Sequence, residues 1–134
     1  MRVKALLILW LLGILFPMVW FTRVSATYNR AFQFVFAPTW THVVMHAFLY
    51  AVLVILAGRF LAPRLRGRGW PAWLGSLLGL ALGVALLQEG IQLWYTGQAA
   101  GADEVFDLSV DLGGAVLGLL VFLRGLRGDG HTSQ

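Results

Sequence analysis

Cysteine is absent from this 134-residue chain, and charged side chains are scarce, at 12% of the residues. The lack of cysteine excludes disulfide bonds, thiolate metal ligands and cysteine nucleophiles. Only six residues are acidic, against ten that are basic. Hydrophobic residues make up 59% of the chain, which is more than a soluble domain of this size normally contains. The composition therefore indicates one membrane domain, residues 1–134, with the lipid bilayer as its solvent.

The hydrophobic residues form four long runs. Each run approaches the ~17 to 25 residues that a membrane-spanning helix needs, and only helices fit so few continuous segments. We therefore predict an all-α polytopic membrane protein, a bundle of four transmembrane helices at about residues 5–21, 40–57, 71–95 and 105–123. The first run has an alternative interpretation as a secretory signal peptide, because Arg2 and Lys4 precede it and Val24-Ser25-Ala26 resembles a cleavage site.

Basic residues decide the predicted orientation. They gather before the first run, between the second and third runs, and after the fourth run, whereas only two fall in the remaining links. By the positive-inside rule, we expect both termini and residues 59–68 to lie in the cytoplasm, as parts of a multi-pass membrane protein. These basic residues flank apolar runs rather than line one face, so we expect membrane lipids as neighbours and no nucleic-acid partner.

Acidic residues have the opposite distribution. Five of the six lie at the outer end of the third and fourth runs or in the link between them: Glu89, Asp103, Glu104, Asp107 and Asp111. A lone ionised group inside a bilayer is costly, so acids within the runs should face one another or water rather than lipid. Asp107 and Asp111 are one helical turn apart and would repel each other if both were ionised. We therefore expect a shared proton or a bound divalent cation at this acidic cluster.

Polar residues recur at helical spacing on three of the predicted spans. At ~1.5 Å of rise per residue, His46, Glu89 and Asp111 each lie roughly 9 Å below the outer boundary. Side chains at one depth on neighbouring helices can meet in one layer, so the pattern predicts an outward-facing polar pocket. The predicted pocket residues are His46, Tyr50, Glu89, Gln92, Asp107 and Asp111.

Three residues carry specific hypotheses. His42 and His46 lie at i and i+4, and with a carboxylate from another span they would suit zinc, although no H-E-x-x-H signature is present. The alternative for His46 is a purely structural hydrogen bond to a neighbouring helix. Glu89 is the only acid of the third span, and we expect Gln88 and Gln92 to satisfy it and its carboxyl to exchange protons near neutral pH.

Small residues predict how the helices pack. Glycines repeat every four residues along the third and fourth spans, a spacing that lets helix backbones approach closely in lipid. These glycines are Gly75, Gly79 and Gly83 on the third span and Gly114 and Gly118 on the fourth. We therefore expect spans three and four to cross at these glycines.

Three segments in this order resemble the VanZ-like family of bacterial membrane proteins. Residues 46–50 (HAFLY) resemble its H-F-x-x-Y element, residues 89–92 (EGIQ) its E-x-x-Q, and residues 107–118 (DLSVDLGGAVLG) its D-x-x-x-N-x-x-G-x-x-x-G. The chain departs from the family at three places, with Asp111 for asparagine, residues 96–99 (TGQA) where the family has an arginine, and His42-Val43 for an acidic-basic pair. Without this arginine, the carboxylates must be balanced in another way. Either some are protonated, or Arg23 or Arg30 folds over the site, or a metal ion binds there.

The resemblance implies a role at the cell envelope, because the family is linked to low-level resistance to glycopeptide antibiotics such as teicoplanin. We therefore expect a pocket that handles a lipid or cell-envelope ligand. The alternative is a small accessory or structural subunit of a larger membrane complex, or a homo-oligomer, whose helices act as packing surfaces. No serine triad, phosphate-binding loop or nucleotide fingerprint is present in the sequence, so it assigns no reaction.

Overall fold

The computed structural model describes residues 2–16, 24–36, 39–65, 67–97 and 99–129. This part of the chain contains helices and no strand, which confirms the all-α prediction. Its five helices are α1 (Arg2–Leu15), α3 (Ala26–Phe36), α4 (Thr39–Leu65), α5 (Trp70–Thr96) and α6 (Ala102–Asp129).

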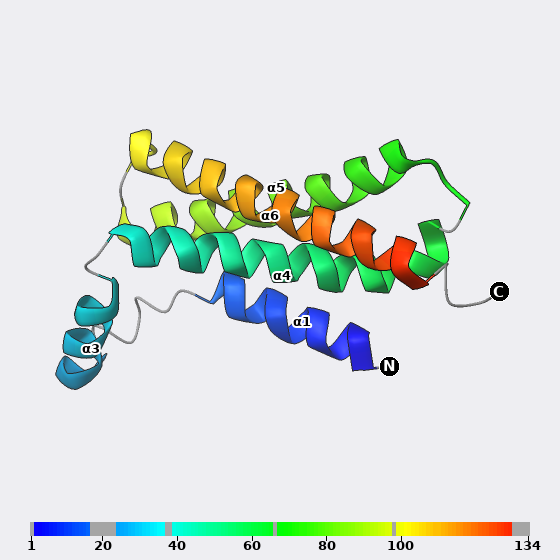
Figure 1. Cartoon of the computed structure of the whole chain (residues 1–134). Helices are drawn as coiled ribbons and strands as arrows, with labels where there is room; N and C mark the ends of the chain where they lie inside the picture. Colours follow the sequence, from blue (N-terminus) through cyan, green and yellow to red (C-terminus); the bar gives the residue numbers. More distant parts are fainter. Residues whose placement is uncertain (1, 17–23, 37–38, 66, 98, 130–134) are drawn as a thin grey trace.

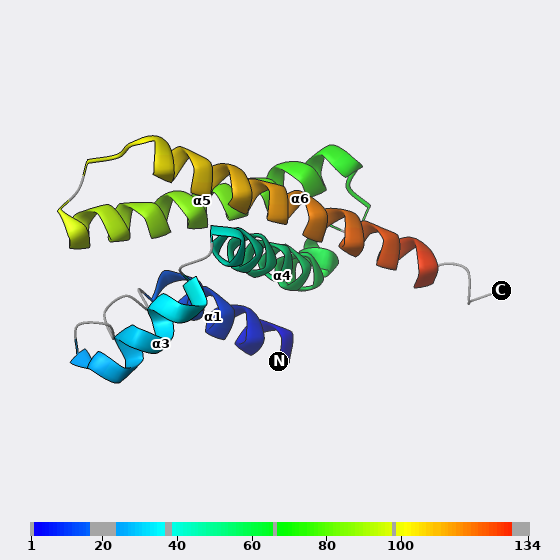
Figure 2. The same ribbon diagram turned by 60° about the vertical axis from the view of Figure 1, so that its left-hand side comes forward.

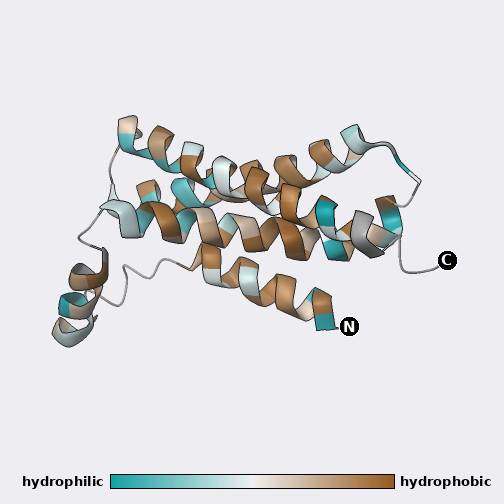
Figure 3. Ribbon diagram, in the orientation of Figure 1, coloured by the Kyte–Doolittle hydropathy of each residue, from teal (hydrophilic) through white to brown (hydrophobic). Residues whose placement is uncertain are grey.

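Three of these helices are long and apolar enough to cross a membrane, namely Thr39–Leu65, Trp70–Thr96 and Ala102–Leu126. They contain the predicted spans 40–57, 71–95 and 105–123, and Figure 3 shows hydrophobic colouring along their middle sections with hydrophilic patches toward the ends. The chain is therefore a membrane protein by the length and composition of its helices. Helix α4 continues through the basic residues Arg59 and Arg64 to Leu65, because arginine is compatible with a helix even where the apolar run has ended.

The first predicted span, residues 5–21, corresponds only in part to a described helix. Helix α1 covers its first two thirds, and residues 17–21 lie outside the described residues. Leu7 and Ile14 of α1 are buried against the other helices. The indole N–H of Trp10 donates a hydrogen bond of 2.9 Å to the carbonyl oxygen of Leu49, and its ring meets Phe48 edge-on. Helix α1 is thus held against the middle of α4.

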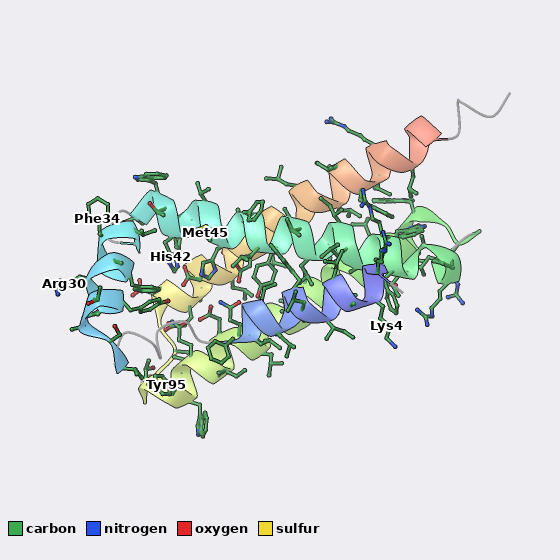
Figure 4. The ribbon with its side chains drawn as sticks, turned by 90° about the horizontal axis from the view of Figure 1, so that it is seen from below. Lys4, Arg30, Phe34, His42, Met45 and Tyr95 are labelled. Atoms are coloured by element: carbon green, nitrogen blue, oxygen red, sulfur yellow. The ribbon has the colours of Figure 1, made fainter. Side chains whose placement is uncertain are left out.

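Helix α3 was not expected from the sequence. Its first turn is capped by Ser25, whose hydroxyl accepts a hydrogen bond of 3.2 Å from the backbone N–H of Tyr28. The rings of Tyr28 and Phe32, one turn apart, stack with their centroids 6.0 Å apart. Figures 1 and 2 show α3 at the end of the bundle where α4 begins, and Figure 4 shows it running across that end.

The direction of the helices separates basic from acidic residues. Helices α4 and α6 run in the same direction, and α1 and α5 run in the opposite direction (Figure 1). The start of α1, the end of α4, the start of α5 and the end of α6 therefore share one end of the bundle, which we call the basic end. Basic residues at this end include Arg2, Lys4, Arg59, Arg64, Arg68 and Arg124. The acidic residues of α5 and α6, apart from Asp129, lie toward the other end, which we call the acidic end.

The closest helix contact joins α4 to α6, not α5 to α6. A Cβ atom added at Gly114 would lie 2.6 Å from the Cα of Ala47, and one added at Gly118 would lie 2.7 Å from the Cα of Ala51. The glycines of α5 lie apart from this contact, because a Cβ added at any of Gly75, Gly79 and Gly83 would meet nothing within 4 Å. The expected glycine-lined crossing of spans three and four is therefore wrong. Gly114 and Gly118 pack against small residues of the parallel helix α4, an arrangement that periodicity alone did not identify.

Candidate functional site

Two histidine–aspartate pairs connect α4 to α6 at the acidic end. His42 Nε2 lies 3.0 Å from Asp107 Oδ1, and one turn deeper His46 Nδ1 lies 2.8 Å from Asp111 Oδ1. Both partners step by four residues because the two helices run in parallel at close range. The tight contact at Gly114 and Gly118, directly below the pairs, holds the two helix backbones in this register.

Burial increases steadily along these pairs. The side chain of His42 is 39% exposed and that of Asp107 is 15% exposed, whereas the values are 13% for His46 and 0% for Asp111. The outer pair is thus reachable from outside the bundle, and the inner pair is enclosed. The rings of His42 and His46 lie 4.3 Å apart between centroids, so the two pairs form one continuous polar cluster.

Tyr50 continues the polar face of α4 for a further turn. Its side chain is fully buried, and its hydroxyl donates a hydrogen bond of 3.0 Å to Gln88 Oε1 on α5. The expectation that Gln88 satisfies Glu89 is therefore wrong, because Gln88 pairs with Tyr50 and neither oxygen of Glu89 has a hydrogen-bond partner among the described residues. Gln88 is a residue of this polar layer that the predicted pocket does not include. The sequence signal that could have identified Gln88 is its depth in the span. Gln88 is next to Glu89 on α5, and at that depth it reaches Tyr50 of α4.

Glu89 is buried without a hydrogen-bond partner. The residue is only 6% exposed, and neither carboxylate oxygen has a hydrogen-bond partner among the described residues. It lies within electrostatic range of His46, Asp107 and Asp111. Asp111 Oδ2 is likewise buried and unpartnered. Three carboxylate oxygens are therefore left without hydrogen bonds inside the helical bundle, a costly arrangement in a low-dielectric environment.

The remaining predicted residues lie outside this cluster. Gln92 is exposed, and its backbone carbonyl accepts a hydrogen bond from the Thr96 hydroxyl. Asp103 is also exposed. Glu104 Oε2 accepts a hydrogen bond of 2.6 Å from the backbone N–H of Gly101, so it caps the start of α6. Within the described part of the chain, none of these three side chains forms a hydrogen bond with the histidine–aspartate pairs, and Glu104 instead stabilises a helix end.

Among the described residues, no lysine or arginine pairs with the carboxylates of the cluster. Arg30 is exposed on α3 and projects away from the bundle in Figure 4, so it does not fold over the site. Arg23, the other cation considered, lies outside the described residues. Protons or a metal ion therefore remain as the means of balancing these carboxylates within the described part of the chain.

The donor atoms of His42, His46 and Asp107 lie close enough to hold a metal ion. One ligand atom from each of the three residues lies within 4.8 Å of the others. Two imidazole nitrogens and one carboxylate oxygen form a donor set typical of zinc and other divalent transition metals. The sequence left the third ligand, a carboxylate from another span, unidentified, and the structure places Asp107 of α6 in that position.

A separate hollow of about 250 Å³ lies near the basic end. It is formed by α4 and α6 and lined by Ile55, Arg59, Val121, Phe122, Gly125 and Leu126. None of the polar cluster residues contributes to it, so it is distinct from the candidate site.

Comparison with known proteins identifies no relative. No protein-family model matches the chain, and no curated protein or solved structure is significantly similar to it. The resemblance to VanZ-like proteins in residues 46–50, 89–92 and 107–118 therefore stays a prediction from the sequence.

Proposed function

We propose that this chain is a VanZ-like protein of the bacterial inner membrane that binds a lipid or cell-envelope ligand at the polar cluster. The observation that supports this function is the unpartnered carboxylate of Glu89, buried beside Asp111 in helices of membrane-spanning character. Ionisable groups at such positions are expensive and usually serve ligands, ions or protons. A purely structural role would favour full hydrogen-bond satisfaction, which Glu89 lacks.

In the proposed topology the acidic end faces the outside, and both termini lie in the cytoplasm. The basic end supports this orientation through the positive-inside rule. Exposed tryptophans are consistent with two membrane boundaries, since Trp40 and Trp94 lie at the acidic end and Trp70 at the basic end. Helix α1 would then be the beginning of a fourth span over residues 5–21. Ligands would reach the cluster from the outer leaflet or the envelope, past the partly exposed His42.

Native mass spectrometry of the full chain tests this function. The protein is purified in a mild detergent from its native membrane, and lipid-sized masses that stay bound are compared between the wild type, Glu89→Gln and Asp111→Asn. We expect a bound species in the wild type that both variants lose. Leu117→Ala is the matched control, because Leu117 is 59% exposed on α6 and away from the cluster, and it should keep the species. Equal binding in all four proteins would contradict the proposed function.

A phenotype provides a second test that follows from the family resemblance. Expression of the wild type in a teicoplanin-sensitive bacterium should raise the minimal inhibitory concentration, and Glu89→Gln at equal membrane abundance should not. Equal resistance for the two proteins would show that Glu89 is not required for this phenotype.

The accessory-subunit alternative has one specific observation in its favour. Gly75, Gly79 and Gly83 form a stripe along α5 with nothing within 4 Å of their added Cβ positions. Such a stripe is suited to close packing against a helix of another chain. Gly79→Leu should then release larger subunits, or a second copy, during native electrophoresis in mild detergent. Unchanged migration of a single small species in both proteins would remove this alternative.

A further inference from the structure

We propose that His42, His46 and Asp107 bind one divalent transition-metal ion and that Asp111 positions His46 for this role. The inference rests on the proposed function in so far as both assign a ligand-binding role to the polar cluster. It goes further by naming the cofactor class, the three ligand residues and the residue that orients one of them.

The distances of the three ligand atoms fit this assignment. Tetrahedral zinc with bonds of about 2.0–2.2 Å places neighbouring ligand atoms roughly 3.4 Å apart. His42 Nε2 and Asp107 Oδ1 lie 3.0 Å apart, and all three candidate atoms lie within 4.8 Å of one another. The His42–Asp107 pair thus already has about the spacing of neighbouring zinc ligands, and the atom of His46 lies no more than 4.8 Å from either of them.

Asp111 gives His46 the hydrogen bond that metal-bound histidines usually have. A histidine ligand normally donates its second ring N–H to a carboxylate or carbonyl, which fixes the tautomer and the ring orientation. His46 Nδ1 lies 2.8 Å from the fully buried Asp111 Oδ1. When Asp111 is ionised, its oxygen can only accept a hydrogen bond, so Nδ1 then donates and Nε2 keeps its lone pair for a metal. A buried aspartate below a ring nitrogen is thus a second observation for a metal site, independent of the ligand spacing.

Charge in the cluster points to the same conclusion. Three carboxyl groups, Asp107, Asp111 and Glu89, lie together on two helices, and no lysine or arginine of the described residues pairs with them. Both oxygens of Glu89 and Oδ2 of Asp111 are buried without partners. A divalent cation beside them compensates negative charge that would otherwise be uncompensated in a low-dielectric environment.

The donor set selects the class of metal. Imidazole nitrogen suits zinc and its transition-metal neighbours, whereas magnesium and calcium prefer sites made of oxygen atoms. Three protein ligands leave a fourth position of a tetrahedral ion open. An oxygen atom of an anionic envelope ligand, such as a phosphate group, would fit that position, and the cation would overcome the repulsion by the carboxylates. His42 and Asp107, the more exposed pair, place the open position toward the outside.

Metal retention by the full chain in detergent is the test, with Zn²⁺ alone as the probe. The protein carries a purification tag without histidine, is loaded with Zn²⁺, dialysed, and analysed for metal per chain. We expect one zinc ion in the wild type, and the same site loaded with Co²⁺ should show the visible absorption of tetrahedral cobalt. Mg²⁺ and Ca²⁺ at equal concentration should not displace the zinc.

Four variants assign the site. His42→Ala and Asp107→Asn, at the partly exposed pair, should abolish stoichiometric retention and the cobalt spectrum. Asp111→Asn should keep the three ligands and weaken zinc affinity about 10- to 100-fold. His131→Ala is the matched histidine control, outside the described residues, and should retain zinc fully. Because His42 is 39% exposed, its loss should leave the fold intact, which the elution profile and tryptophan fluorescence of the apo-protein verify.

The outcomes separate this inference from the proposed function. Absence of retained zinc, or equal retention in wild type and His42→Ala, would overturn the metal site. If the lipid-sized species still depends on Glu89 in that case, the proposed function stands without the metal. Loss of both the zinc and the Glu89 dependence would overturn both proposals, and zinc retention that disappears with His42 and Asp107 supports the site.

Discussion

The interface between α4 and α6 has two halves that are built differently. Toward the acidic end, polar side chains face each other in the two histidine–aspartate pairs. Toward the basic end, the side chains that the same two helices bury are apolar: Leu53, Val54 and Ala57 from α4, and Ala115, Leu119 and Phe122 from α6. The transition falls at Gly114 and Gly118, where the helix backbones are closest.

The two halves differ in how strictly they determine the pairing of α4 with α6. In lipid, apolar side chains gain little by meeting each other rather than acyl chains, so helix association depends on close packing and on interhelical hydrogen bonds. The apolar half supplies packing that many sequences can provide. The polar half requires a partner at each turn, and a shift of α6 along α4 would leave Asp111 without His46. The polar half therefore fixes the register, and the glycine contact makes it possible.

The largest expected effect comes from filling the glycine contact. In Gly114→Ala the new methyl group would overlap the backbone of Ala47, which cannot move aside as a side chain would. We expect a loss of about 3 kcal/mol in stability and separation of α4 from α6. Thermal unfolding in mild detergent, followed by tryptophan fluorescence, measures the change. Gly113→Ala is the matched control, because its Cβ would meet nothing within 4 Å, and it should stabilise the helix by up to ~1 kcal/mol. Equal melting of the two variants would contradict the close contact.

The two histidines should differ in their contribution to stability. His46→Ala removes the partner of the fully buried Asp111, so we expect a loss of about 3 kcal/mol. His42→Ala breaks a partly exposed pair and should cost about 1 kcal/mol or less. The same fluorescence melts, run on apo-protein, compare the two variants. A larger loss of stability for His42→Ala than for His46→Ala would contradict the assignment of His46–Asp111 as the buried pair.

Tyr50 allows a milder test of the border between the two halves. Tyr50→Phe keeps the buried ring and removes only the hydrogen bond to Gln88. Interhelical hydrogen bonds in membrane proteins contribute about 0.6 kcal/mol on average, so a loss of that order is expected. Gln88→Leu together with Tyr50→Phe should be additive only if the two residues do not interact, so a double-mutant cycle measures their coupling directly. A coupling energy of zero would show that the bond does not contribute to stability.

The fold was largely predictable because its signal is simple. Long apolar runs decide where spans lie, and three of the four predicted spans correspond to helices of membrane-spanning length. Helix α3 was missed because it is short and lies between apolar runs, although Ser25 followed by Tyr28 and Phe32 at helical spacing indicates a capped helix. Hydropathy measures affinity for lipid over long windows, and it does not detect a short helix between the apolar runs.

The site was predictable in its depth but not in its pairing. Counting residues placed His46, Glu89 and Asp111 at one level, and the structure brings His46 and Asp111 into a direct hydrogen bond. The sequence did not indicate that α4 pairs with α6. Glycine repeats occur on both α5 and α6, and they suggested that these two helices contact each other. Which helices are neighbours depends on the whole bundle, so the pairing of His42 with Asp107 and of Tyr50 with Gln88 required the structure.

Glu89 provides a small expected effect on stability and the sharpest distinction between structure and function. Its carboxyl group has no hydrogen bond to lose, so Glu89→Gln removes an ionisable buried group at no cost in contacts. We expect apo-protein stability to change by less than about 1 kcal/mol, in the stabilising direction, because an unpaired buried charge is itself unfavourable. The lipid-sized species should nevertheless be lost from this variant. Fluorescence melts and native mass spectrometry on one preparation measure both quantities. A strongly destabilised Glu89→Gln would mean that the carboxyl supports the bundle, and the case for a ligand-binding role would then disappear.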